Sequence, residues 1–461
     1  MLKKYEDYKE TQISYLGSLP SHWNILPLRS ILFERKEKNI GKKNNEILSV
    51  MANRGVILYS EKGNVGNKAS DNIERYNVVY EDDIVLNCMN VIIGSVGRSP
   101  YNGVLSPVYY VLVNRNTQTY NTRYYDYVFK LKPLQSELKK YGKGILAHRM
   151  RISMDSLKSL NLPCPPIEEQ NQVVKYLDWK LSKINKLIRA KKKQIVLLNE
   201  QKQVIINNAV TKGLDPNVPM KDSGIEWIGQ IPIHWNVIRL RGILSPVSIK
   251  NHPKLPLLSV LREKGVIVRD VKDKESNHNF IPDDLSGYKV VQAGQFVMNK
   301  MKAWQGSYGI SPYTGIVSPA YFVFDVNVKN KDYFHYSIRS KVYVNFFAQA
   351  SNGIRVGQWD LNISKMKDIP FIVPSEEEQT LIIDYIKRTS KDIEVAITRF
   401  SNEIKLLQEY RTRLISDVVT GKVDVRDIEI PEYEADSDET IDDEIDDNLV
   451  LDEEDGEMEV E

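Results

Sequence analysis

The stretch 168–210 contains neither glycine nor proline, and it constrains the fold of this chain more than any other feature. Apolar residues recur along it every three or four positions, which predicts one face of an α-helix rather than a strand. At a rise of 1.5 Å per residue, such a helix would be roughly 65 Å long. The recurring apolar residues are Val174, Leu177, Leu181, Ile184, Ile188, Ile195, Leu198 and Ile205.

A second stretch of the same kind, 377–419, begins 209 residues later with the same letters, Glu-Glu-Gln, after a proline. A strip this long and narrow cannot bury its apolar residues against itself and needs a partner helix. We therefore expect the two helices to pack on each other; the alternative is that each packs on its own domain. The second apolar seam is Ile383, Ile386, Ile393, Ile397, Phe400, Ile404, Leu407 and Leu414.

The composition is that of a globular protein with two to four domains, since 461 residues are 42% hydrophobic and 27% charged. The chain has no run of 18 apolar residues and no apolar segment of signal-peptide type at Met1. Its two cysteines, Cys88 and Cys164, lie too far apart in sequence to suggest a disulfide framework or a zinc site. These features predict a cytoplasmic protein without membrane association and without a bound metal.

The charges are unevenly distributed along the chain. Residues 432–461 carry seventeen of the 61 acidic residues and no Lys or Arg, which leaves 63 basic and 44 acidic residues elsewhere, a net charge of +19. A basic body predicts a polyanionic partner. The acidic tail, 425–461, is low in aromatic residues and is predicted to be disordered. It could solvate the chain or occupy the basic surface when the polyanionic partner is absent.

Much of the sequence is an internal duplication. The closest internal match pairs residues 87–112 with 299–324, where 13 of 26 positions are identical. A period above 200 residues is too long for a solenoid and indicates a duplicated domain followed by a duplicated helix. The predicted segments are a first domain (1–166), a central helix (167–211), a second domain (212–375), a C-terminal helix (376–424) and the acidic tail (425–461).

Inside each domain the local patterns are mixed. Alternating apolar residues between Gly and Pro punctuation predict short strands, and longer amphipathic patterns predict helices, so the fold class is α+β. The predicted strands are 78–86, 108–113, 290–298 and 321–326, and the predicted domain helices are 124–141 and 333–350.

The sequence lacks the usual signs of catalysis. His22 and His234 are equivalent in the two repeats, but no carboxylate or nucleophile is repeated in register with them, which favours packing or surface roles. The glycine-containing stretch 63–66 lacks the Gly-Lys-Ser/Thr ending of a phosphate loop. No adenine methyltransferase motif and no acidic nuclease cluster is present. These observations predict a binding protein without catalytic residues.

Three duplicated motifs carry a resemblance to a known family. Together, twice and in the same order, they indicate that residues 9 to about 424 resemble the specificity subunit of type I restriction–modification enzymes. The motifs are Gly-x-x-Pro-x-x-Trp (Gly17, Pro20, Trp23 and Gly229, Pro232, Trp235), Ser-Pro-x-Tyr (Ser106–Tyr109 and Ser318–Tyr321) and a Pro-x-x-Glu-Gln-type opening of each long helix (Pro166–Gln170 and Pro374–Gln379).

The resemblance implies an architecture and a set of partners. Each globular half would be a target recognition domain that reads one part of a split site in double-stranded DNA, and the two long helices would pack antiparallel as a spacer. The target should then be bipartite and asymmetric, because the two halves differ in their loops. Two adenine methyltransferase subunits and two restriction (motor–nuclease) subunits would dock on this chain. S-adenosylmethionine, ATP and magnesium would belong to those subunits, so the chain itself needs no cofactor.

Sequence discrimination needs Arg, Lys, Asn or Gln side chains that reach base edges. We expect them where the two halves differ inside their shared frame; the alternative for each is a solvated polar residue. Repetition predicts structural roles for Tyr101, Tyr109, Tyr313 and Tyr321, whereas Trp304 could stack on a base or fill space. The candidates are Arg54, Lys62, Asn64, Asn90, Arg98, Arg149 and Arg151 in the first half and Arg262, Lys264, Lys300, Lys302, Gln305, Arg355 and Gln358 in the second.

Two other functions are compatible with parts of this pattern. A scaffold that binds only proteins would also use duplicated domains and long helices, but the basic body disfavours it. A nuclease with a degenerate active site is the second alternative. Metal-dependent DNA cleavage by the purified chain alone would favour it.

Overall fold

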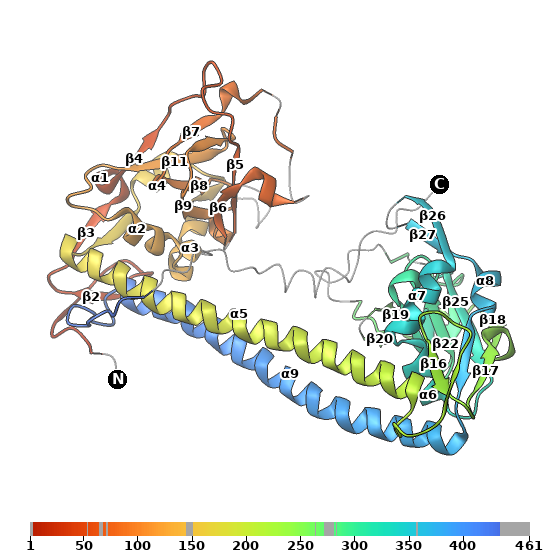
Figure 1. Cartoon of the computed structure of the whole chain (residues 1–461). Helices are drawn as coiled ribbons and strands as arrows, with labels where there is room; N and C mark the ends of the chain where they lie inside the picture. The colour runs from red at the N-terminus through yellow and green to blue at the C-terminus, as the bar shows by residue number, and fades with distance from the viewer. Residues whose placement is uncertain are drawn as a thin grey trace. The chain divides into compact units, whose positions relative to one another are not determined.

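The computed structural model describes residues 3–433, except residues 53, 64–67, 71, 144–150, 263, 272–280, 283 and 356–357. The chain divides into two compact units, and Figure 1 labels their elements. Unit 1 contains Met1–Ala190 and Asn402–Asp442, and unit 2 contains Lys191–Ser401 and Asp443–Glu461. Each unit therefore combines one globular part with a portion of both long helices.

The two long helices form as the periodicity predicts. Helix α5 spans Ile167–Lys212 and helix α9 spans Glu376–Val419. Both carry acidic residues in the first turn, where they stabilise the positive end of the helix dipole. Each is followed within two residues by a glycine with positive φ, Gly213 or Gly421. Because α9 ends at Val419, residues 420–424 of the predicted C-terminal helix are not helical.

Side chains of α5 and α9 contact each other within unit 2. In unit 2 the Lys202 ammonium lies 2.6 Å from a Glu394 carboxylate oxygen, and the Lys191 ammonium lies 4.9 Å from the centre of the Phe400 ring. Residue numbers rise on one helix as they fall on the other, so these segments run antiparallel in unit 2. The buried seam residues are Val174, Leu177, Leu181, Ile184 and Ile188 in unit 1 α5, Ile404 and Leu414 in unit 1 α9, and Ile383, Ile386 and Ile393 in unit 2 α9.

The globular part of unit 1 is built on a four-stranded antiparallel sheet in the order β4-β11-β8-β9, with short two-stranded pairs around it. The sheet strands are β4 (Leu32–Arg35), β8 (Ile84–Asn87), β9 (Val96–Arg98) and β11 (Tyr109–Asn114). The paired strands are β1 (Tyr8–Glu10) with β2 (Ser18–Pro20), β3 (Asn24–Pro27) with β14 (Asn161–Cys164), β5 (Leu48–Met51) with β6 (Gly55–Leu58), β7 (Asn77–Val79) with β10 (Gly103–Leu105), and β12 (Gly142–Lys143) with β13 (Arg151–Ile152). The helices are α1 (Leu28–Ile31), α2 (Thr122–Phe129), α3 (Lys132–Leu138) and α4 (Met154–Lys158).

Unit 2 repeats this topology, with a four-stranded sheet in the order β18-β25-β22-β23. The sheet strands are β18 (Leu244–Val247), β22 (Phe296–Asn299), β23 (Tyr308–Ile310) and β25 (Tyr321–Val326). The paired strands are β15 (Met220–Asp222) with β16 (Gln230–Pro232), β17 (Asn236–Arg239) with β28 (Pro370–Val373), β19 (Leu258–Leu261) with β20 (Gly265–Val268), β21 (Lys289–Val291) with β24 (Gly315–Val317), and β26 (Ser351–Arg355) with β27 (Gln358–Leu361). The helices are α6 (Lys331–Ile338), α7 (Lys341–Gln349) and α8 (Ile363–Lys367).

The duplication extends to the hydrophobic core. One cluster of buried residues occupies equivalent positions in both units, and its members alternate along the strands, as expected for side chains that share one face of a sheet. The observed helices and antiparallel strands establish mixed helix and strand content, as predicted. The cluster is Leu48, Val50, Val56, Val79, Val85, Leu105 and Val111 in unit 1, and Leu258, Val260, Val266, Val291, Val297, Val317 and Val323 in unit 2.

Several predicted elements are split in two. The predicted strand 78–86 is interrupted by a turn in which Asp82 has φ of 69°, and strand 290–298 is interrupted at Gly294, with φ of 87°. The predicted helices 124–141 and 333–350 each become a pair of short helices, because Leu131 and Ser340 adopt extended backbone and cap the second helix. Amphipathic periodicity continues across both breaks, so it could not reveal them.

The start of the predicted disordered tail is part of unit 1. Val425 is only 1% exposed, and the Gln172 side-chain amide donates hydrogen bonds to the carbonyls of Val425 (3.0 Å) and Ile428 (2.8 Å). The Arg426 guanidinium lies 4.8 Å from the centre of the Tyr5 ring. The prediction of disorder was therefore wrong for residues 425–433, and residues 434–461 lie outside the described part of the chain.

None of the helices in the described part of the chain combines the length and the apolar character needed to cross a membrane.

Candidate nucleic-acid interface

The duplicated Trp motif and the duplicated helix opening meet in each unit. In unit 1 the buried Trp23 indole donates to the Glu169 carboxylate at 2.9 Å, and the Tyr5 hydroxyl donates to the same oxygen at 3.1 Å. In unit 2 the Trp235 indole donates to the Glu378 carboxylate at 3.2 Å. The motifs that are far apart in sequence thus join each globular part to the start of a long helix.

The two repeated histidines belong to the same contacts, which agrees with the structural role predicted for them. The His22 imidazole hydrogen-bonds to Glu169, and the His234 imidazole hydrogen-bonds to Glu378 at 2.8 Å. Partial burial alone would raise the pKa of Glu378. The hydrogen bonds from His234, Trp235 and Ser375 together outweigh this effect, so the pKa lies below its ordinary value. The carboxylate therefore stays charged and holds its donors.

The same tryptophans also contact the end of the other long helix. A Cβ atom on Gly421, which follows α9, would lie 3.1 Å from the Trp23 ring, and one on Gly213, which follows α5, would lie 3.2 Å from the Trp235 ring. Both glycines have positive φ, a conformation that favours glycine. In each unit, one tryptophan thus contacts the start of one long helix and the end of the other.

The predicted DNA-binding residues of unit 1 fall into two groups. The first group lies where the backbones of β6 and β9 approach each other closely. A Cβ atom on Gly97 would lie 2.9 Å from the Gly55 Cα atom. Arg54 precedes Gly55 in the turn of the β5–β6 hairpin, and Arg98 follows Gly97 at the end of β9. The Arg98 guanidinium pairs with Asp82. Lys62 lies in the short helix after β6, its ammonium 5.1 Å from the centre of the Tyr59 ring, and Asn64 lies outside the described residues.

The second group of unit 1 lies where the β12–β13 hairpin meets the loop after β8. The Ile152 amide donates to the Cys88 carbonyl at 2.9 Å, and this hydrogen bond places Arg151 beside that loop. Burial raises the pKa of the Cys88 thiol, although Arg151 opposes this by its charge and a hydrogen bond. Asn90 begins the 3-10 turn of the same loop, and Arg149 lies outside the described residues.

Unit 2 has the same two groups with different side chains. Arg262 and Lys264 flank the turn of the β19–β20 hairpin, and the Arg339 guanidinium holds this hairpin by donating to the carbonyls of Arg262 (2.7 Å) and Tyr308 (2.6 Å). In the second group, Lys300, Lys302 and Gln305 occupy the loop after β22, whose short 3-10 helix contacts β27. The predicted residues Arg355 and Gln358 belong to the β26–β27 hairpin, and their side chains lie outside the described part.

Asp360 is a residue of this region that the sequence did not single out. It occupies in β27 the position that Arg151 occupies in β13, and its carboxylate forms an ion pair with the Lys300 ammonium. The Leu361 amide donates to the Lys300 carbonyl at 3.3 Å, as Ile152 does to Cys88. One backbone frame thus carries Cys88 and Arg151 in unit 1 but Lys300 and Asp360 in unit 2. Aligning the ends of the two repeats would have revealed Asp360.

Aromatic packing in the same loop involves Trp304. The Trp304 ring packs against Trp359 in a tilted arrangement, with the ring centres 5.0 Å apart and the planes at 43°. Its indole N–H donates to no acceptor among the described residues. Trp304 therefore contacts the β26–β27 hairpin in this structure.

The repeated tyrosines are mostly structural, as predicted. Tyr101, Tyr109 and Tyr321 pack against the duplicated core clusters. Tyr313 is the exception, since 44% of it is exposed.

Equivalent backbone amides donate to different side chains in the two units. The Arg98 amide donates to the Asp126 carboxylate at 3.0 Å, and the equivalent Ile310 amide donates to Nδ1 of His335 at 3.1 Å. Burial, helped by the Arg339 charge, lowers the pKa of His335 to about 4. The neutral imidazole is the form that can accept this hydrogen bond.

Acidification should therefore destabilise unit 2 through His335. The pKa of this histidine is about 4 when folded and about 6.5 when unfolded, so the unfolded state binds more protons between these values. The stabilisation is complete above pH 6.5, is lost as the pH falls towards 4, and amounts to about 2 kcal/mol between pH 7 and 5. Urea unfolding at pH 5, 6 and 7 measures it. His335→Asn keeps an acceptor that does not titrate, and an unchanged pH dependence in this variant would contradict the assignment.

Among the described residues, no three His, Cys, Asp or Glu side chains are placed to hold a metal ion. Both cysteines are free and buried.

Comparisons with known proteins agree with the motifs. A family model, the type I restriction modification DNA specificity domain, matches residues 20–197. The type I restriction enzyme MjaVIII specificity subunit of Methanocaldococcus jannaschii is 25% identical over 376 residues, which cover 76% of this chain and 81% of that protein. A second protein of this organism, provisionally assigned as the type I restriction enzyme MjaX specificity subunit, is 24% identical over 442 residues, 92% of this chain and 98% of its own length.

The fold also matches a solved structure. A chain from a study of complex assembly and conformational transition in the type I restriction–modification system superimposes with a TM-score of 0.61. The match covers 87% of this chain and 98% of that chain at 12% identity, so it supports the fold alone. The matching family model, the two relatives and the duplicated motifs show that this chain is similar to the specificity subunits of type I restriction–modification systems.

Proposed function

We propose that this chain recognises a bipartite, asymmetric target in double-stranded DNA, with one half-site read by each globular part. The proposed recognition domains are residues 1–166 and 212–375. The observation that carries the proposal is the exchange of Cys88 and Arg151 for Lys300 and Asp360 on equivalent backbone positions. A shared frame with different polar groups is what two readers of different base sequences require.

The base-reading residues are proposed to be the two groups in each unit. Hairpin turns and short loops at strand ends can place Arg, Lys, Asn and Gln side chains in the major groove, where each base pair presents a distinct pattern. Asp360 joins them because a carboxylate accepts hydrogen bonds from the amino group of cytosine. The full set is Arg54, Lys62, Asn64, Asn90, Arg98, Arg149, Arg151, Arg262, Lys264, Lys300, Lys302, Gln305, Arg355, Gln358 and Asp360.

The long helices are proposed to serve as an antiparallel spacer and as the docking site for partner subunits. Two adenine methyltransferase subunits and two restriction subunits would assemble on the chain. Exposed apolar side chains on both helices support this, because such residues mark protein-binding surfaces when they cluster. They are Leu187, Leu406 and Tyr410 in unit 1 and Val196, Leu197, Val204, Leu381 and Val395 in unit 2.

A map of methylated adenines tests this function directly. DNA would be taken from cells that express the chain together with its neighbouring methyltransferase gene. A single split motif with one modified adenine on each strand is the expected result. Absence of methylation, when both proteins are folded and associated, would favour the scaffold alternative instead.

Removing the Lys300 side chain should weaken specific binding more than non-specific binding. A base contact is worth about 1–3 kcal/mol, so Lys300→Ala should weaken binding to the specific duplex by about 5- to 150-fold. Competition between specific and scrambled duplexes measures this. Lys329→Ala is a matched control, since Lys329 is also a lysine of unit 2 in an ion pair, with Glu376.

The double variant Lys300→Ala/Asp360→Ala separates two causes of such a loss. If Lys300 reads a base, the double variant stays impaired. If the single variant suffers only because Asp360 loses its partner and repels DNA, removal of both charges restores binding. An equal loss on both duplexes would make Lys300 a phosphate contact.

A further inference from the structure

One face of α5 in unit 1 carries an unusual set of side chains. Lys175, Trp179, Lys183 and Lys186 follow at spacings of four, four and three residues, so they share one side of the helix. The three lysines are exposed, and the buried apolar seam lies on the opposite side. We call these four residues the basic face.

The basic face lacks compensating charge. Residues 179–193 contain seven Lys or Arg and no Asp or Glu. In the described part of the chain, no carboxylate forms an ion pair with Lys175, Lys183 or Lys186. Like charges at these spacings repel each other along a helix. An anionic partner would therefore stabilise this face.

Trp179 adds a second feature to the basic face. The ammonium groups of Lys180 and Lys183 lie 4.2 and 4.5 Å from the centre of its ring. Its indole N–H donates to no acceptor among the described residues. A carboxylate brought to this face would meet both ammonium groups.

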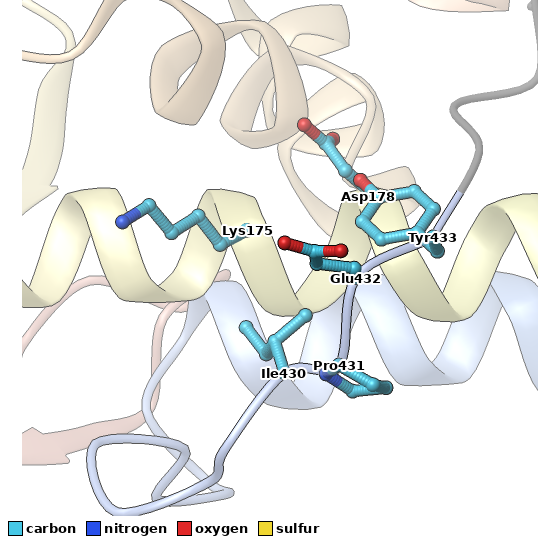
Figure 2. Close-up of a pocket in the computed structure, with 6 residues that line it drawn as sticks. All are labelled: Lys175, Asp178, Ile430, Pro431, Glu432 and Tyr433. Carbon is cyan, nitrogen blue, oxygen red and sulfur yellow. The ribbon is translucent and has the colours of Figure 1, made fainter.

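The last described residues of the chain lie at one end of this face. Figure 2 shows Ile430–Tyr433 crossing α5 beside Lys175 and Asp178, where together they line an open pocket of about 650 Å³. Asp178 is already engaged, since the Tyr127 hydroxyl (2.6 Å) and the Arg123 guanidinium (2.8 Å) donate to its carboxylate. The chain therefore continues from Tyr433, which lies beside Asp178 in Figure 2, and the Asp178 carboxylate is already bound by another element.

We propose that the acidic segment 434–461 docks on the basic face of α5. This segment has sixteen Asp or Glu in 28 residues and no Lys or Arg, which matches the charge of the face. The face spans roughly 17 Å from Lys175 to Lys186 at 1.5 Å per residue, well within reach of 28 residues at up to roughly 3.3 Å each. Tethering raises the effective concentration of the segment to the order of millimolar, so weak ion pairs suffice. The proposal does not depend on how the chain recognises DNA.

The test follows the mobility of the segment in the full chain. A fluorophore is attached at Met458→Cys, because Cys88 and Cys164 are buried and leave this thiol as the reactive one. The docking variant is Lys175→Gln/Lys183→Gln/Lys186→Gln. The matched control is Lys43→Gln/Lys132→Gln/Lys139→Gln, which removes three exposed lysines elsewhere in unit 1. Circular dichroism melting establishes that both variants are folded.

Docking predicts high fluorophore anisotropy at 50 mM salt in the parent and control proteins. The docking variant should fall to the level of the free labelled peptide, and 500 mM salt should cause the same fall in the parent without any mutation, because ion pairs are screened. Equal anisotropy in the parent and a folded docking variant would overturn the proposal. Two other results would also overturn the proposal, because each would place the segment elsewhere on the chain. One is an equal fall in anisotropy in the docking and control variants. The other is a docking variant whose anisotropy is still high and falls only when duplex DNA is added.

Discussion

Exchanging residues 1–166 for the equivalent segment of a relative with a different target should change one half of the recognised sequence and leave the other half unchanged. The reason is that each globular part has its own sheet, core cluster and two groups of polar loop residues. Each mismatched base pair costs about 1–3 kcal/mol, so two or three mismatches in the original half-site should weaken its recognition by at least about 30-fold.

The expected change can be read from methylated adenines in cells that express the exchanged chain with its methyltransferase. The reciprocal exchange, over residues 220–375, is the matched control and should alter only the other half-site. Both exchanges leave most of α5 and α9 intact. If one exchange altered both halves of the target, base reading would not be modular and the proposed division of labour would fail.

Replacing Glu169 by Ala should destabilise unit 1 more than most single substitutions. Glu169 is only 8% exposed, and its carboxylate hydrogen-bonds to the side chains of Trp23, Tyr5 and His22. Each buried donor left without a partner costs about 1–3 kcal/mol, so we expect a loss of about 3–5 kcal/mol in the free energy of unfolding. Urea unfolding followed by tryptophan fluorescence measures it.

Two controls frame the Glu169 result. Glu168→Ala alters the exposed neighbour and should change stability by no more than about 0.5 kcal/mol. Glu378→Ala should have an intermediate effect, because its side chain is 32% exposed and its hydrogen bond from Trp235 is longer. Similar losses for Glu168 and Glu169 would show that the buried hydrogen bonds do not carry the effect.

The long helices could be predicted almost to the residue, because an apolar period of three to four without glycine or proline is a local property of the sequence. Glu168–Val210 was expected to be helical, and α5 spans Ile167–Lys212. The duplicated frame was equally visible, since the repeated letters mark equivalent backbone positions. The apolar seam also required a partner helix, and within unit 2 that partner is α9.

The breaks within predicted elements depended on single backbone conformations. Asp82 turns the chain between β7 and β8 with positive φ, in a stretch whose apolar residues look like one strand. Ser340 is extended at the start of α7, although the amphipathic pattern continues through it. Periodicity reports which face a residue occupies, and it does not report a change of direction that preserves the face.

By itself, the sequence determined the two helices, the duplication, the basic body and the resemblance to type I specificity subunits. Each of these depends on periodicity, repetition or charge along the chain, which can be seen without the fold. Only the tertiary structure decided which distant groups meet. It brought Trp23 to Glu169 and paired Lys300 with Asp360. It also placed Asp126 in unit 1 and His335 in unit 2 as the acceptors of equivalent backbone amides. These contacts join residues between 25 and 146 positions apart. Residues this far apart in sequence come together only when the chain folds, so the pattern of neighbouring residues does not predict these contacts.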